Sequence, residues 1–308
     1  MMGDSYKGGS LAILPAYNEQ GSIEDVVLKA KEYVDRVIVV DDGSTDETSV
    51  IAKLCGAEVI KHKKNRGYGA ALQSCFEQAR KYDANVMVVF DSDGQHDPSE
   101  IPILLRGINA SNADVVIGSR FLNGTNGIPT YRKLGIKVLN SVTNAVSGLD
   151  ISDTQSGYRA YSKNAINKIS IESAGMSAGS EILIQAKRND LKIQEVPINC
   201  KYDVDNPSTF NPVRHGISVL MGIVKTVVFD RPLFYFGGAG GFMFFMGFIF
   251  AMQLLWGYNF GGNMRFGGEA IFMMLFILSG LLTTFTGLML YSINRLKKGF
   301  DAGWENDA

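Results

Sequence analysis

The chain has 308 residues, 46% of them hydrophobic, and a formal net charge of −1. This length can bury a sizeable core and carry a second unit, while the near-neutral charge argues against nucleic acid or another polyanion as a partner. The three cysteines, at positions 55, 75 and 200, are far apart and lack a C-x-x-C spacing, so neither a disulfide framework nor a zinc site is expected.

Apolar strand-like runs alternate with amphipathic segments through the first 200 residues. The sequence predicts strands at 11–15, 37–41, 57–60, 86–91 and 114–118, and helices at 22–33, 46–55, 69–82 and 99–109. The stretch Ser22-Ile-Glu-Asp25 resembles a capping box at the start of the first helix. The alternation indicates βαβ crossovers, and continuous Val/Ile runs indicate strands that are buried on both faces. We therefore expect an α/β fold with a mostly parallel, doubly wound sheet and helices on both faces.

Polar motifs follow three of these predicted strands. Ala16-Tyr17-Asn18-Glu19 follows the first strand, Asp41-Asp42-Gly43-Ser44 the second and Asp91-Ser92-Asp93 the fourth. Ligands bind parallel sheets beyond the carboxyl ends of the strands. The three acidic turns are therefore expected to face one crevice.

Asp91 and Asp93 are two residues apart, so on an extended segment both carboxylates point to the same side and can meet one ion or one substrate group. Hard oxygen ligands suit Mg²⁺ or Mn²⁺, which proteins usually hold with one or two carboxylates plus substrate phosphates. A bound diphosphate would then supply the remaining ligands. A D-x-D triplet by itself is also an ordinary turn sequence, because Asp and Gly are common turn residues.

Several motifs together make the signal more specific. They are P-A-Y-N-E at 15–19, V-V-D-D-G-S-T-D at 39–46, N-R-G-Y-G-A-A at 65–71 and G-S-R at 118–120. In this order and spacing the chain resembles glycosyltransferase family 2 over roughly residues 10–200. The resemblance implies the GT-A fold, in which a Rossmann-like sheet binds a nucleotide sugar. Within the family, D-S-D-G-Q-H-D-P at 91–98 is similar to a segment of polyprenyl-phosphate sugar synthases, such as the dolichyl-phosphate mannose and glucose synthases.

The resemblance also assigns roles by position. It implies that the metal, Mg²⁺ or Mn²⁺, is held by Asp91, Asp93 and Gln95. It implies that the nucleotide sugar is bound by Pro15, Tyr17, Glu19, Asp42, Asp91, Ser92, Asp93, Gln95 and Arg120. Asp93, Arg120 and Arg132 become the candidate catalytic residues, with both arginines contacting phosphates, for which their planar fork is suited. An exposed surface charge is the alternative for each arginine.

Two further segments bear on the substrate site. D-T-Q-S-G-Y-R-A-Y at 153–161 is similar to an element that helps to line the sugar site in these synthases, although Arg159 has weaker support than the other arginines. The Ser-Lys loop of the mannose synthases is replaced here by N-P-S-T-F-N-P-V-R-H at 206–215. Candidates for the acceptor-phosphate contacts are Arg132, Ser208 and Arg214, with His215 also present. His96 is expected to be structural rather than catalytic, and His62 shows no ligand pattern.

The function implied is transfer of one sugar from a nucleoside diphosphate, such as GDP-mannose or a UDP-hexose, to a polyprenyl phosphate. No E-D or D-D pair occurs between Asp97 and the membrane segments to serve as a catalytic base. A phosphate monoester, with a second pKa of about 6, is already anionic and needs positioning by cations more than a base. We expect one in-line displacement that inverts the sugar configuration. The alternatives are a polysaccharide synthase, whose Q-x-x-R-W motif is absent, and a non-enzymatic, membrane-tethered nucleotide-sugar sensor.

Two stretches of 24 residues without a charge, at 233–256 and 270–293, predict a transmembrane hairpin. At about 1.5 Å per residue, each helix reaches roughly 36 Å across a hydrocarbon core of about 30 Å. Two buried helices of a soluble protein are the alternative. The glycines at 237, 238, 240 and 241 are expected to let the first helix approach the second closely.

Basic residues flank the predicted hairpin on both sides, whereas the loop inside it holds only Arg265. This asymmetry predicts a multi-pass membrane protein with both ends cytoplasmic, and the start of the chain has no signal-peptide core. We expect a catalytic domain at 1–210, a juxtamembrane interfacial helix at 211–231, the hairpin at 232–294 and a basic tail at 295–308. A plain linker helix is the alternative for 211–231. A homo-oligomer is left open.

Overall fold

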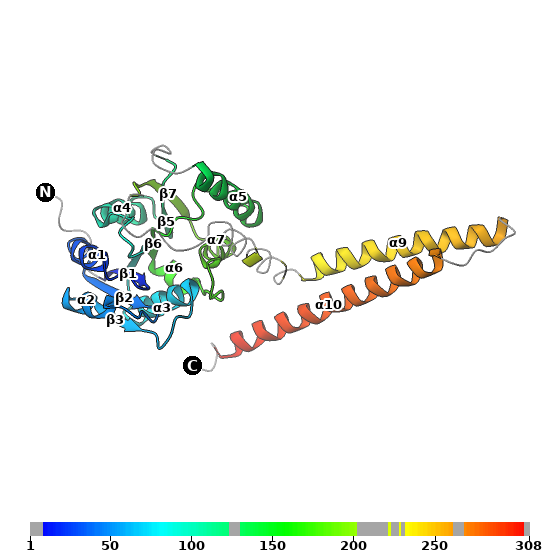
Figure 1. Cartoon of the computed structure of the whole chain (residues 1–308), viewed down its shortest axis with the longest axis horizontal. Helices are drawn as coiled ribbons and strands as arrows, with labels where there is room; N and C mark the ends of the chain where they lie inside the picture. The colour runs from blue at the N-terminus through cyan, green and yellow to red at the C-terminus, as the bar shows by residue number, and fades with distance from the viewer. Residues whose placement is uncertain are drawn as a thin grey trace. The chain divides into compact units, whose positions relative to one another are not determined.

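The computed structural model describes residues 9–122, 130–201, 221–222, 228, 232–260 and 268–304 (Figure 1). The chain forms two compact units, divided between residues 223 and 224. The first unit is expected from the sequence to be catalytic and is called the catalytic unit below. It contains β1 (Ser10–Ala16), α1 (Ile23–Ala30), β2 (Arg36–Asp41), α2 (Thr48–Leu54), β3 (Glu58–Lys61), α3 (Tyr68–Lys81), β4 (Val86–Val89), the 3₁₀ turn η1 (Pro98–Glu100), α4 (Ile101–Ala110), β5 (Val115–Ser119), α5 (Thr130–Ser147), β6 (Arg159–Ser162), α6 (Lys163–Lys168), α7 (Ala178–Arg188) and β7 (Ile193–Pro197). The second unit contains α9 (Pro232–Phe260) and α10 (Gly268–Trp304).

The catalytic unit is built on a seven-stranded sheet with the order β3-β2-β1-β4-β6-β5-β7. Strands β1 to β4 run parallel, β5 and β7 are parallel to each other, and β6 is antiparallel to both of its neighbours. The carboxyl ends of β1, β2, β4 and β5 therefore share one edge with the amino end of β6. We call this edge, which carries the polar motifs, the ligand edge. The predicted mostly parallel α/β sheet is confirmed.

Two hydrophobic clusters cover the two faces of the sheet, because successive residues of a buried strand point to opposite sides. Leu11 and Ile13 of β1 pack in the cluster that includes α3, α6 and α7. Ala12 and Leu14 pack in the cluster that includes α1, α2 and α4. The chain is thus doubly wound, with a rigid sheet that positions the turns at the ligand edge.

Some local predictions were wrong. Strands β6 and β7 were not predicted, and the capping box at Ser22 does not form: its hydroxyl makes no cap hydrogen bond to α1. The hydroxyl instead donates to the carbonyl oxygen of Ser92, 2.7 Å away. Ser22 therefore ties the start of α1 to the turn 91–95 after β4, which carries the predicted metal ligands and is called the metal motif below.

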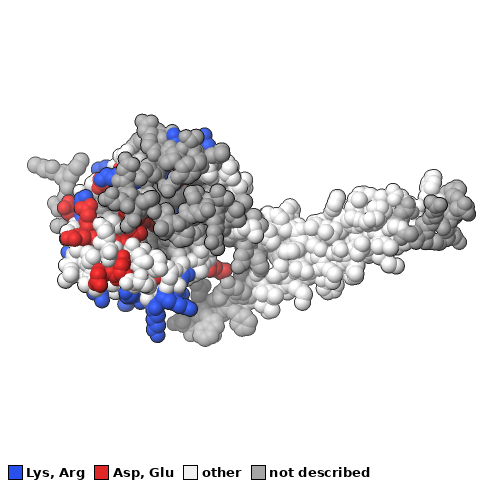
Figure 2. Space-filling model, viewed as in Figure 1, with Lys and Arg blue, Asp and Glu red and all other residues white. Residues whose placement is uncertain are grey.

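The second unit is a pair of apolar helices. The spans Pro232–Trp256 and Ala270–Leu296 have mean hydropathies of 1.7 and 2.0 over their most apolar windows, of which only 11% is buried. Helices in the core of a soluble protein would be mostly buried, so the exposure favours membrane spans. Figure 2 shows charged side chains on the catalytic unit and uncharged surface along the described faces of the two spans.

Glycines seven residues apart in each helix let α9 and α10 pack closely: they are at 240 and 247 in α9 and at 280 and 287 in α10. A Cβ at Gly240 would lie 2.8 Å from the carbonyl oxygen of Gly280, and one at Gly287 would lie 2.9 Å from the Cβ of Phe236. The predicted close approach is confirmed for Gly240. It is wrong for three neighbours, since no described atom lies within 4 Å of a Cβ built at Gly237, Gly238 or Gly241. The expected interfacial helix at 211–231 falls almost wholly outside the described residues.

Candidate active site

The metal motif follows β4 and is anchored to the end of β1. The hydroxyl of the buried Ser92 donates to the carbonyl oxygen of Pro15 at 2.9 Å. Gln95 donates to both carboxylate oxygens of Asp93, from its backbone N–H at 3.0 Å and from Nε2 at 2.7 Å. Gln95 therefore fixes the orientation of the Asp93 carboxylate at the ligand edge.

Three carboxylates repel one another in this region. Burial, followed by the charge of Asp93, raises the pKa of Asp91 to about 7, against a hydrogen bond from Tyr68 and the charge of Arg120, which lower it. Burial raises the pKa of Asp93. Burial and the charge of Asp93 raise the pKa of Glu19 to about 7. A cation at this position would relieve the repulsion and favour the ionised carboxylates.

Hard oxygen donors fit Mg²⁺ or Mn²⁺. Within the described parts of the chain, no three His, Cys, Asp or Glu side chains converge closely enough to hold a metal without other ligands. The predicted set of Asp91, Asp93 and Gln95 thus suits an ion that also takes oxygens from a substrate phosphate. The motif 153–161 contributes to the same place through its glycine: a Cβ at Gly157 would lie 2.8 Å from Oδ2 of Asp91. Only glycine lets the backbone pass this close to the carboxylate.

Three rings, those of Phe90, Tyr158 and His96, pack together next to the metal motif. Tyr158 lies 4.8 Å from Phe90 and 5.1 Å from His96 between ring centroids, and its hydroxyl donates to the carbonyl oxygen of Asp97 at 3.2 Å. Burial lowers the pKa of His96 to about 3, so its ring is neutral at physiological pH. His96 lies in the packing behind the carboxylates.

Asp42, a predicted nucleotide contact, holds the loop between β3 and α3. Its carboxylate accepts from the backbone N–H of Arg66 at 3.0 Å and of Gly67 at 2.8 Å. The ring of His62 bridges this carboxylate, 2.6 Å from Nδ1, and the hydroxyl of Ser74, 2.9 Å from Nε2. Sequence reasoning missed this role of His62, whose only sequence signal is its place before the N-R-G-Y-G-A-A motif.

Three other predicted nucleotide contacts lie at the carboxyl end of β1. Pro15 is buried, Glu19 is half-buried and Tyr17 is 44% exposed. The structure therefore brings these residues to the same edge as Asp42 and the metal motif.

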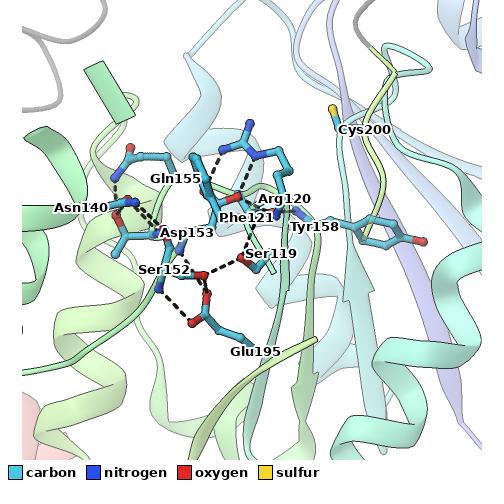
Figure 3. Close-up of polar contacts among 12 residues, drawn as sticks. Ser119, Arg120, Phe121, Asn140, Ser152, Asp153, Gln155, Tyr158, Glu195 and Cys200 are labelled. Atoms are coloured by element: carbon cyan, nitrogen blue, oxygen red, sulfur yellow. Dashed lines mark hydrogen bonds and ion pairs between the residues drawn. The ribbon is translucent and has the colours of Figure 1, made fainter. Parts of the chain in front are cut away.

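Arg120 follows β5 and forms a side-on ion pair with Asp153 (Figure 3). Its Nε donates to Oδ2 of Asp153 at 2.7 Å and its Nη2 to Oδ1 at 2.8 Å, while the backbone N–H of Arg120 donates to Oδ2 at 3.1 Å. Asp153 has no exposed surface. The sequence placed Asp153 in a motif of the sugar site but did not reveal it as the partner of Arg120.

The remaining predicted arginines differ in their surroundings. Arg159 is buried and donates to the carbonyl oxygens of Thr154 at 2.7 Å, Ser156 at 2.8 Å and Gly179 at 2.8 Å, so it organises the loop before β6. Arg132 belongs to α5, and its side chain lies outside the described residues, as do the other acceptor candidates, Ser208, Arg214 and His215.

Comparison with known families identifies the chain. The family model for glycosyl transferase family 2 matches residues 11–170, which is 160 of the 308 residues. The chain belongs to glycosyltransferase family 2. The carboxylates after β4 and the turns after β1 and β2 all lie within the matched segment.

Two relatives match about two thirds of the chain. The UDP-N-acetylglucosamine–dolichyl-phosphate N-acetylglucosaminyltransferase of Methanococcus voltae is 34% identical over 232 residues, which cover 68% of this chain and 90% of that protein. The polyprenol monophosphomannose synthase of Mycolicibacterium smegmatis is 31% identical over 226 residues, which cover 69% of this chain and 81% of that protein.

A solved structure shows the same fold. Glucosyl-3-phosphoglycerate synthase from Mycobacterium tuberculosis, in complex with Mn²⁺, uridine diphosphate and phosphoglyceric acid, matches with a TM-score of 0.56 and 22% identity. The match covers 70% of this chain and 78% of that one. The GT-A fold expected from the sequence is therefore confirmed.

Proposed function

We propose that this protein transfers one sugar from a nucleoside-diphosphate sugar to the phosphate of a polyprenyl lipid, giving a lipid-linked sugar. The main support is that one chain combines a carboxylate site at the ligand edge with two exposed apolar helices. The helices would hold the enzyme at the bilayer, where an isoprenoid acceptor stays. The names of the relatives support the same substrates, since they include transferases for dolichyl and polyprenyl phosphates.

The donor diphosphate is expected to lie against Asp91, Asp93 and Arg120. A divalent cation held by Asp91, Asp93 and Gln95 would neutralise the charge that develops on the departing diphosphate. The side-on pair with Asp153 holds the Arg120 guanidinium at the ligand edge. The planar fork of an arginine is suited to contact diphosphate oxygens.

The acceptor phosphate would attack the anomeric carbon without a protein base. The new bond joins a phosphate oxygen to the anomeric carbon, and the bond from that carbon to the diphosphate breaks, with its electron pair leaving on the nucleoside diphosphate. A single displacement of this kind inverts the configuration. Arg132, Ser208 and Arg214 are proposed to position the acceptor phosphate, because a dianion needs cations and donors rather than a base.

We place the catalytic unit on the cytoplasmic side of the membrane. Three bases precede the first span and three follow the second: Arg214, Lys225, Arg231, Arg295, Lys297 and Lys298. The positive-inside rule favours the cytoplasm for both flanks. Nucleotide sugars would then reach the ligand edge directly.

The acceptor is tested by comparing two lipids that differ only in the phosphate. Purified protein in vesicles receives Mn²⁺, a panel of GDP- and UDP-sugars, and either polyprenyl phosphate or the corresponding polyprenol. Mass spectrometry should detect a glycosylated lipid with the phosphate acceptor alone. Equal glycosylation of polyprenol, or extension of an added glycan instead, would refute the proposed acceptor.

A further inference from the structure

We propose that Glu195, on the outer strand β7, is a positioning residue for Arg120: it fixes the peptide segment that carries Asp153, and Asp153 in turn fixes the guanidinium. This inference rests on the proposed function, in which Arg120 meets the donor diphosphate. None of the hydrogen bonds described for Glu195 is made with Arg120.

The carboxylate of Glu195 accepts three hydrogen bonds from the segment before β6. The backbone N–H of Ser152 donates to Oε2 at 2.9 Å, and the N–H of Asp153 donates to Oε1 at 3.0 Å. The hydroxyl of Ser152 also donates to Oε1, at 2.7 Å. Each oxygen of Glu195 therefore holds one peptide N–H on the amino side of the Asp153 side chain.

Asn140, on α5, holds the same segment from its other side (Figure 3). Its Nδ2 donates to the carbonyl oxygen of Ser152 at 2.6 Å, and its Oδ1 accepts from the N–H of Thr154 at 3.0 Å. The hydroxyls of Ser119 and Ser152 lie 2.6 Å apart, which joins the segment to the end of β5 beside Arg120. The peptide groups before and after Asp153 are thus fixed by side chains from two other elements.

The consequence for Arg120 is orientation. Its side chain has many rotamers, but a bidentate pair with a buried, immobile carboxylate selects one of them. A misplacement of about 1 Å at a charged contact can cost about a hundredfold in rate. Glu195→Gln keeps the shape of the side chain but puts an NH₂ group against one of the two N–H donors. That repulsion would release the segment and let Asp153 and Arg120 turn.

The test measures binding of UDP and of GDP, each with Mn²⁺, to the full chain by titration calorimetry. We expect Glu195→Gln and Arg120→Met each to weaken binding about tenfold or more, as loss of a charge-assisted hydrogen bond does. The double variant should bind no more weakly than Arg120→Met alone, because Glu195 acts through Arg120. If Arg120→Met fails to fold, Arg120→Lys replaces it in the cycle. If Glu195→Gln fails to fold, Ser152→Ala replaces it.

Asp114→Asn is a matched control at the opposite end of β5. Asp114 also accepts three hydrogen bonds, from the N–H of Lys192 at 3.0 Å, from Ser162 Oγ at 2.9 Å and from Asn164 Nδ2 at 2.8 Å. Asp114→Asn should lower the melting temperature and leave nucleotide affinity unchanged.

Two results would overturn the inference. One is a double variant whose loss of nucleotide affinity is the product of the two single losses; the other is an unchanged affinity in a folded Glu195→Gln protein. Nucleotide binding needs no lipid. If the variants show the predicted cycle but the wild type glycosylates no polyprenyl phosphate, the proposed function alone is refuted. A wild type that binds neither nucleotide would refute both.

Discussion

Adding one methyl group at Gly157 should displace the Asp91 carboxylate and impair the enzyme. A Cβ at this position lies 2.8 Å from Oδ2, 3.3 Å from Cγ and 3.4 Å from Oδ1 of Asp91. Ordinary van der Waals contact begins at 3.4 Å, so Oδ2 must move by at least 3.4 − 2.8 = 0.6 Å. A shift of this size at a carboxylate proposed to bind the metal should lower kcat/KM by about tenfold to a hundredfold. Overpacking should also lower the free energy of unfolding by about 1–3 kcal/mol.

The assay is sugar transfer by Gly157→Ala over a range of Mn²⁺ concentrations. The concentration for half-maximal activity should rise, because the displaced carboxylate holds the ion less well. Gly175→Ala is the control, since no described atom lies within 4 Å of a Cβ at that position. A folded Gly157→Ala enzyme with wild-type activity and an unchanged Mn²⁺ requirement would refute the placement of Asp91 at the metal.

Two further predictions concern pH and the hairpin. Because burial and Asp93 raise the pKa of Asp91 from 3.8 to about 7, the folded chain holds a proton there that the unfolded chain has lost. The melting temperature without metal should therefore fall between about pH 4 and pH 7, and saturating Mn²⁺ should reverse the trend; a rise over this range would contradict the raised pKa. In the hairpin, Gly240→Leu should lower the free energy of unfolding by about 1–3 kcal/mol. Gly241→Leu should not, because no described atom lies within 4 Å of a Cβ at that position. Equal effects of the two substitutions on the rate of thermal inactivation would refute the interface.

The central strands were predictable because burial on both faces demands a continuous apolar sequence. The runs in β1, β2 and β4 show this directly. Strand β6 reads Arg-Ala-Tyr-Ser and is short, so it carries no comparable signal. Its antiparallel direction depends on neighbours that are distant in sequence. Strand β7 reads Ile-Gln-Glu-Val-Pro and is only partly buried.

The site was predictable where its residues are close together in sequence. Asp91, Asp93 and Gln95 form one short motif, and the structure keeps them adjacent after β4. Two residues behind Arg120 could not be found in this way: Asp153, which pairs with it, and Glu195, which holds the segment of Asp153. Asp153 and Glu195 are 33 and 75 residues from Arg120 along the chain, and they come together because β6 and β7 lie on either side of β5 in the sheet. Opposite charges in the two motifs were the one available signal for Asp153.

The most direct test of the proposed function is the stoichiometry of one reaction. Purified wild-type protein and Asp93→Asn are given a radiolabelled nucleotide sugar, Mn²⁺ and polyprenyl phosphate, and both released nucleoside diphosphate and label in the lipid extract are counted. We predict one labelled lipid for each diphosphate released, and loss of both products in Asp93→Asn or when the metal is chelated. Diphosphate release that does not depend on the lipid, or label that never enters the extract for any donor, would contradict the account.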